Sequence, residues 1–168
     1  MSKQILLCME CRQQSKTDYV YIKEMIDHFF TYDKNKTSIK PVWMTSKGQY
    51  HSAKVQKKIA EYVKGFPGDT TVIYFIDIDH WDTNPVDQKM LEDIKNYCGE
   101  KGYEFVWLCR DVEDVFLGRQ VDKRTKVSEA SRFRSKHLID EVDIEKLKCR
   151  DYKLHGSNVY VVMEKVLG

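Results

Sequence analysis

The segment TVIYFIDIDHWDTNP, residues 71–85, places an apolar run directly before three aspartates. Five consecutive apolar or aromatic side chains fit a β-strand that is buried on both faces, as in a parallel sheet. Asp77, Asp79 and Asp82 then follow with almost no polar transition. Carboxylates that lie close together repel and raise each other's pKa unless a cation or solvent relieves them. The segment therefore predicts either a metal site at the end of a buried strand or a strand that simply ends at the surface.

The rest of the chain alternates between strand and helix patterns, which is typical of an α/β domain with a mainly parallel central sheet flanked by helices. The first helix has Thr17 or Asp18 as its expected N-cap, and the third opens at TNP because proline fits a first turn. After Cys109 the pattern weakens into a mostly helical C-terminal part. The expected strands are 3–10, 37–44, 71–78 and 103–109, and the expected helices are 18–30, 52–62 and 85–99.

Composition predicts one domain over residues 1–168, with a core from about 4 to 118 and a helical extension from about 119 to 168. A formal net charge of +2 gives no general bias toward nucleic acid, so such binding would depend on local patches. No apolar segment reads as a signal peptide or a membrane span, so we expect a cytoplasmic protein without a membrane partner. The five cysteines, an odd number, are expected to be reduced and not to bind metal.

Acidic residues follow three of the predicted strands. Glu10 ends the first strand, Asp77 and Asp79 end the third, and Glu113 lies shortly after the fourth. Because the carboxyl ends of parallel strands share one edge of the sheet, these four residues are the candidate catalytic and metal-binding groups. An oxygen-rich set of this kind suits Mg²⁺ or Mn²⁺. A solvated strand end remains the alternative for each acid, and Asp82 and Asp114 are expected to serve in a turn and at a helix N-terminus.

Three motifs give the chain a resemblance to Toprim (topoisomerase–primase) domains, and within them to the RloB-like proteins, a prokaryotic family associated with defence. The motifs are ILLCMECRQQSKTDYVYIKEMI, IYFIDIDHWD and WLCRDVEDVFLG, which cover residues 4 to about 118. The resemblance implies a Rossmann-like fold and metal-dependent phosphodiester chemistry. It makes Glu10 a general acid or base and makes Asp77 and Asp79 the metal ligands. The chain departs from the Toprim pattern where Cys11 follows the glutamate in place of glycine.

A basic segment at residues 118–137, GRQVDKRTKVSEASRFRSKH, is the candidate surface for DNA or RNA. It has seven lysines and arginines against two acids, and basic side chains near a metal site would neutralise phosphates. Phe133 between two arginines would allow base stacking, and a plain solvated helix is the alternative. Lys47 and His51 are expected at the same sheet edge, where His51 would contact phosphate or transfer protons. The segment's candidate residues are Arg119, Lys123, Arg124, Lys126, Arg132 and Arg134.

The leading hypothesis is a divalent-metal-dependent nuclease of Toprim type that acts on DNA or RNA. A non-catalytic nucleic-acid-binding or regulatory module with the same fold is the main alternative. The expected protein partner is a second copy of the chain, in a homodimer, or a defence-system protein. A phosphohydrolase of the haloacid dehalogenase type is a further alternative, because FIDID resembles its D-x-D with an aspartate nucleophile. Trp81 stands where that pattern has threonine or valine, and the motif normally lies on the first strand.

Overall fold

A computed structural model describes residues 1–168, and it contains four strands joined by helices. The strands are β1 (Lys3–Met9), β2 (Thr37–Trp43), β3 (Asp69–Ile78) and β4 (Glu104–Cys109). The helices are α1 (Thr17–Phe29), α2 (Ala53–Gly65), α3 (Pro85–Lys101), α4 (Val112–Leu117), α5 (Lys126–Ser135) and α6 (Val159–Leu167). Short 3₁₀ helices are η1 (Lys47–Gln49), η2 (Leu138–Glu141) and η3 (Ile144–Leu147). The predicted strands and the first three helices are confirmed to within a few residues.

All four strands are parallel, in the spatial order β2-β1-β3-β4. The chain moves from β1 outward to β2, crosses back to β3 on the other side of β1, and continues to β4. The order therefore reverses between β1 and β3, where Cys8 pairs with Tyr74. Open parallel sheets bind ligands beyond the carboxyl ends of the strands at such a switch point. The predicted α/β fold with a Rossmann-like parallel sheet is confirmed.

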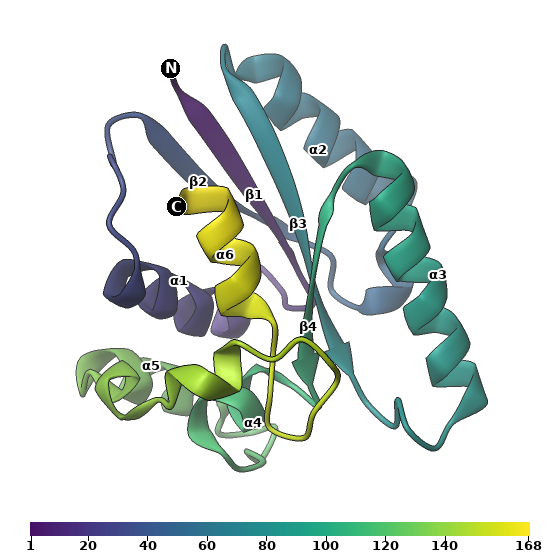
Figure 1. The fold of residues 1–168 in the computed structure, drawn as a ribbon, viewed down its shortest axis with the longest axis vertical. Helices are drawn as coiled ribbons and strands as arrows, with labels where there is room; N and C mark the ends of the chain where they lie inside the picture. The colour runs from purple at the N-terminus through teal and green to yellow at the C-terminus, as the bar shows by residue number, and fades with distance from the viewer.

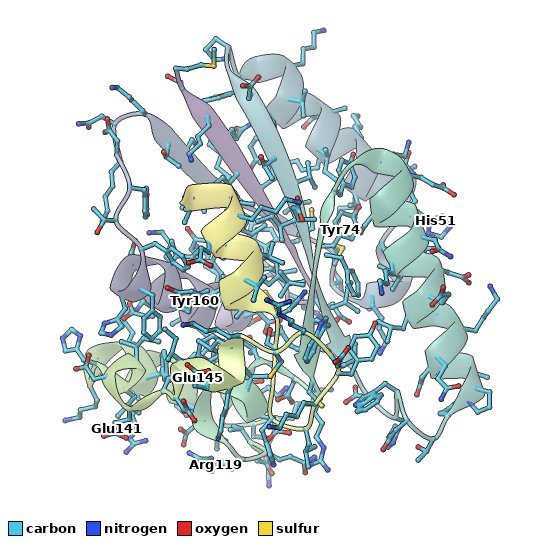
Figure 2. All side chains as sticks on the ribbon, viewed as in Figure 1. His51, Tyr74, Arg119, Glu141, Glu145 and Tyr160 are labelled. Atoms are coloured by element: carbon cyan, nitrogen blue, oxygen red, sulfur yellow. The ribbon has the colours of Figure 1, made fainter.

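Helices cover both faces of the sheet and create two cores. Figure 1 shows α1, α5 and α6 on one side of the strands and α2 and α3 on the other. Side chains alternate along each strand, so Phe75 packs toward α1 while Tyr74 packs toward α2 and α3. Figure 2 shows Tyr74 on the α3 side of the sheet, in the direction of His51. Burial on both faces explains why the strand segments read as continuous apolar runs.

The C-terminal part shares the core of the α1 face. Phe133 of α5 is fully buried, with its ring 4.7 Å from that of Tyr21 in α1. The prediction that Phe133 could stack on a base is therefore wrong, because its ring fills the core between α1 and α5. Val159 and Met163 of α6 belong to the same core. Residues 119–168 thus complete the sheet's α1 face, since without them apolar side chains of α1 and β4 would be exposed.

The N-cap of α3 agrees with the sequence-based prediction, whereas the N-cap of α1 does not. Asn84 caps α3, as expected for TNP, and its side chain accepts hydrogen bonds from the main-chain N–H groups of the first turn. The expected cap of α1 is wrong, because Lys16 is the N-cap and Thr17 and Asp18 are already helical and buried. Their side chains therefore face the interior of the protein and do not cap the helix.

Among the helices of the structure, none combines the length and the apolar character that a membrane span requires.

The outer edge of β4 is closed by the segment before α6. The Asn158 amide accepts a hydrogen bond from the Trp107 main-chain N–H at 3.0 Å and donates one to the Phe105 carbonyl at 3.0 Å. The Ser157 hydroxyl donates to the Trp107 carbonyl at 2.6 Å. The side chains of Ser157 and Asn158 thus take the place of a neighbouring strand at this edge of β4. A covered edge cannot pair with the strands of other chains.

Asn158→Ala is expected to lower the free energy of unfolding by about 2 kcal/mol, because it leaves a main-chain N–H and a carbonyl of β4 without partners. Urea denaturation measures the change. Asn96→Ala, on the exposed side of α3, is the matched control and should change stability by less than about 0.5 kcal/mol. Equal effects of the two substitutions would contradict the proposed role of Asn158.

Candidate functional site

Glu10 joins three strand ends at the switch point. Its two carboxylate oxygens accept main-chain hydrogen bonds, one from Lys47 N–H at 2.9 Å and one from Asp77 N–H at 2.5 Å. The Lys47 ammonium donates in turn to the Asp77 carbonyl at 3.1 Å. Lys47 follows β2, and Asp77 is the second-to-last residue of β3. The structure therefore brings Glu10 and Asp77 into contact at one edge of the sheet, as the sequence predicts. Both oxygens of Glu10 are already bound by the protein main chain.

The two aspartates of the D-x-D have different environments. Asp77 is half-buried, and its Oδ1 is buried without a hydrogen-bond partner. Asp79 lies just beyond the end of β3 and is exposed. Asp82 is exposed in the turn before Pro85. Asp77 is therefore the buried acid of the motif, while Asp79 lies at the solvent-facing rim.

Helices α1 and α4 bring further acids to Asp77. Glu113 in the first turn of α4 is buried, and neither of its carboxylate oxygens has a hydrogen-bond partner. Asp18 in the first turn of α1 is also buried and accepts only a long bond of 3.4 Å from Thr17. Asp111 caps α4 through the N–H of Asp114 at 2.8 Å. We call Glu10, Asp18, Asp77, Asp111 and Glu113 the carboxylate cluster.

The pKa directions show that these carboxylates act on one another. Burial, followed by repulsion from Glu10, Asp18, Asp111 and Glu113, raises the pKa of Asp77 well above its ordinary value. Burial and then Glu10 raise the pKa of Asp18 to about 7. Burial and then Asp18 raise the pKa of Glu113 to about 7. Burial also raises the pKa of Glu10, against the hydrogen bond from Asp77 N–H.

Lys126 supplies the positive charge nearest to the cluster. Its ammonium lies 3.6 Å from both Asp111 Oδ2 and Glu113 Oε2. Burial lowers the pKa of Lys126, but the attraction of Glu113, Asp111, Asp77 and Asp18 outweighs burial and raises it. Lys126 was predicted to contact nucleic acid, and in the structure it instead faces the carboxylates. Lys47, whose ammonium donates to the Asp77 carbonyl, is the second cation at this site, so two cations face five acids.

The donors of the carboxylate cluster are oxygen atoms, the ligand type of hard divalent cations. Carboxylate oxygens are the ligands that Mg²⁺ and Mn²⁺ prefer, and the partnerless oxygens of Asp77 and Glu113 are the buried polar atoms that such an ion would satisfy. The side chains do not form a closed coordination shell as they stand, because no three His, Cys, Asp or Glu side chains converge on one point. An ion would require Lys126 or a carboxylate to turn.

The backbone is strained where the chain leaves three of the strands. Thr45, His80 and Arg110, which follow β2, β3 and β4, all have positive φ, and so does Lys16 in the connection after β1. Left-handed backbone at a residue other than glycine costs about 1 kcal/mol. Strain of this kind collects at functional sites. These four residues lie at the sheet edge that carries the carboxylate cluster, and His137 and His155 are the other non-glycine residues with positive φ.

The candidate nucleic-acid residues do not form one continuous surface. His51 is exposed, with its ring stacked 4.2 Å from that of Tyr50, and Figure 2 shows it on the α3 side of the sheet, far from Arg119 below α4. Arg119 and Arg132 pair with Glu129, and Arg124 pairs with Asp122. Lys123 and Arg134 are exposed and have no acidic partner. Two of the six candidate residues of the basic segment are therefore unpaired, and Lys136, the seventh cation of the segment, is also exposed without an acidic partner.

The sequence reasoning missed two features of this edge. From the sequence, Asp18 is expected only as a helix cap, although the first motif that resembles Toprim domains contains it. Asp114 lies in the first turn of α4, as expected, but the sequence does not show that it is fully buried and bound to His155 Nδ1 at 2.6 Å. That pair spans 41 residues, so no local pattern could show it. All five cysteines are free thiols, as the sequence predicts. Burial raises the pKa of Cys8, Cys11, Cys98 and Cys109, which keeps these four in the thiol form.

Glu113→Gln is expected to make the protein more stable at pH 8, by on the order of 3 kcal/mol. The folded-state pKa of about 7 exceeds the ordinary 4.5, so the native state holds this proton more tightly, and stability falls as pH rises through that window. Urea denaturation at pH 5 and pH 8 measures both effects, with exposed Glu92→Gln as the control. A loss of stability in Glu113→Gln at pH 8 would contradict this prediction.

Known proteins add no further information on this site. Comparison of the chain with protein-family models, curated proteins and solved structures finds no match. The resemblance to Toprim domains and RloB-like proteins therefore stays an expectation that depends on the quoted motifs. The site is defined by its own geometry, as a buried carboxylate cluster at the switch point of a parallel sheet.

Proposed function

We propose that the protein is a divalent-metal-dependent nuclease, with Mg²⁺ or Mn²⁺ held by the carboxylate cluster. The observation that supports this most is that Asp77 Oδ1 and both Glu113 oxygens are buried and accept no hydrogen bond, with only the Lys126 ammonium 3.6 Å from Glu113 Oε2. Buried carboxylates without hydrogen bonds are costly, and these lie where parallel sheets place their ligands. A cation is the simplest group that would balance them. The short motifs shared with Toprim domains point to the same chemistry.

The geometry divides the predicted site residues by role. Asp77, Glu113 and the additional Asp18 are the residues that would hold an ion, because their side chains are buried and lack strong partners. Glu10 positions Asp77, since both of its oxygens bind main-chain N–H groups. Asp79 at the exposed rim is left to contact water or substrate. A bound ion would activate a water molecule and neutralise charge that develops on the phosphate.

The substrate is proposed to be DNA or RNA, bound through the phosphate backbone. Lys123 and Arg134 are exposed candidate residues of the basic segment without an acidic partner. Lys123 precedes α5 and Arg134 lies in its last turn, while Lys126 at the start of the same helix reaches the cluster. Phosphate contacts of this kind give affinity without sequence preference. Lys47 belongs to the site through its main-chain bond to Glu10 and its ammonium bond to the Asp77 carbonyl.

A non-catalytic nucleic-acid-binding module is the second candidate, and Lys126 is the observation that favours it. Its ammonium lies between Asp111 and Glu113, where it partly neutralises the cluster without a metal. A protein that used Lys126 permanently in this way would bind nucleic acid equally well in EDTA and would not cleave it. Divalent-ion dependence therefore separates the two candidates.

Asp77→Asn is expected to abolish cleavage of single- or double-stranded DNA or RNA in Mg²⁺ or Mn²⁺, because it removes a charged ligand while keeping the shape of the side chain. Asp69→Asn, which changes an exposed residue at the opposite end of β3, is the control and should cleave as the unmodified protein does. Gel assays with and without EDTA, on proteins with matched thermal unfolding, measure this. Undiminished cleavage by Asp77→Asn would remove the proposal.

Joint replacement of Lys123 and Arg134 by alanine is expected to weaken oligonucleotide binding and to lower the slope of log K against log[salt] by about 2, one per lost phosphate contact. Replacement of Arg119 by alanine should have a smaller effect, because its guanidinium already pairs with Glu129 at 3.0 Å. Fluorescence anisotropy at several salt concentrations measures the slopes. Equal slopes for all three proteins would show that the basic segment does not contact phosphate.

A further inference from the structure

A buried aspartate next to the carboxylate cluster holds two basic side chains that the proposed reaction has not used. Asp114 is fully buried, and its Oδ1 lies 2.6 Å from His155 Nδ1. Its Oδ2 has no hydrogen-bond partner, and the Nε of Arg110 lies 3.7 Å from it. His155 and Arg110 are themselves 35% and 44% exposed. One carboxylate therefore orients an imidazole and a guanidinium whose other nitrogens remain free.

The segment that carries His155 is fixed from both sides. Gly156 accepts a hydrogen bond from the Cys109 N–H at 3.0 Å, and Ser157 donates its N–H to the Lys146 carbonyl at 2.8 Å. A side chain at Gly156 would meet Cys149 Sγ at 2.8 Å, so glycine is needed for this close approach. His155 and Arg110 both have positive φ, at 62° and 68°. The fold holds both residues in costly conformations that place their side chains on the same carboxylate.

A cavity of about 320 Å³ at the carboxyl ends of β3 and β4 has Arg110 in its wall, while His155 lies one residue beyond the wall residue Leu154. Arg110, His80, Gln120 and Trp81 provide donors in its wall, and Leu154, the neighbour of His155, completes one side. Asp79 and Asp82 also line it, both exposed to solvent. The cavity thus connects the rim of the D-x-D segment with the Arg110 guanidinium.

We propose that Arg110 and His155, held together by Asp114, form a phosphate-binding subsite for the nucleic-acid substrate. Arginine matches the paired oxygens of a phosphate with several N–H donors. With Nδ1 engaged by Asp114, Nε2 is the ring nitrogen of His155 that is left to face a phosphate oxygen. The Asp114 carboxylate lies 3.7 Å from the Arg110 guanidinium and holds it in a partly buried place. The assignment of nucleic acid as the ligand rests on the proposed function, whereas the assignment of a phosphate-binding subsite does not.

The test follows the histidine ring signals by NMR during titration with inorganic phosphate and with a 5′-phosphorylated trithymidylate, both in EDTA. We expect the His155 ring signals to shift with either probe. Arg110→Asn and His155→Asn should each weaken binding about tenfold or more, as loss of a charged hydrogen bond does. Asparagine tolerates positive φ, so neither substitution adds backbone strain. His28→Asn, at an exposed histidine of α1 outside the basic segment, is the control and should bind as the unmodified protein does.

An unresponsive His155, or undiminished binding by both variants, would overturn the subsite. Binding of inorganic phosphate without the trinucleotide would overturn its assignment to nucleic acid. The titration needs neither metal nor turnover, so it is independent of cleavage. A protein that cleaves nothing but binds phosphate at His155 contradicts the nuclease alone. A nuclease whose His155 ignores phosphate contradicts the subsite alone.

Discussion

The carboxylate of Glu10 is the interaction on which the architecture of this sheet edge depends. It accepts the main-chain N–H groups of Lys47 and Asp77, so one side chain at the end of β1 fixes the chain after β2 and the end of β3. Charge-assisted hydrogen bonds of this kind are about twice as strong as neutral ones. The positions of Asp77 and of Lys47 in the site both follow from it.

With Glu10 in place, the fold brings together acids that repel. Asp18 and Glu113 lie in the first turns of α1 and α4, where a helix N-terminus favours negative charge, yet burial still raises their pKa values to about 7. The chain also adopts left-handed backbone at Thr45, His80 and Arg110 along this edge. Each of these features lowers the stability of the folded protein. Natural proteins tolerate such features mainly where the same residues bind or react.

The sequence predicted the sheet and the general position of the site, because both follow from short-range patterns. Apolar runs identified the buried strands, and parallel connectivity brought Glu10 and Asp77 to one edge. The depth of each acid could not be predicted, since Asp77 and Asp79 differ by two residues but only Asp77 lies within the strand. Phe133 showed the same limitation, because a residue between two arginines reads as surface until α5 is packed on α1. Asp114 and His155 meet only through the fold of residues 144–158.

Binding of a divalent ion by the carboxylate cluster can be measured by NMR with paramagnetic Mn²⁺. Substoichiometric Mn²⁺ broadens the NMR signals of amides near a bound ion, without any need for a substrate. We expect the amides of Asp18, Asp77 and Glu113 to broaden first, and we expect Asp77→Asn to abolish this broadening. Broadening confined to exposed acids such as Asp79 and Asp82, or none at all, would contradict it.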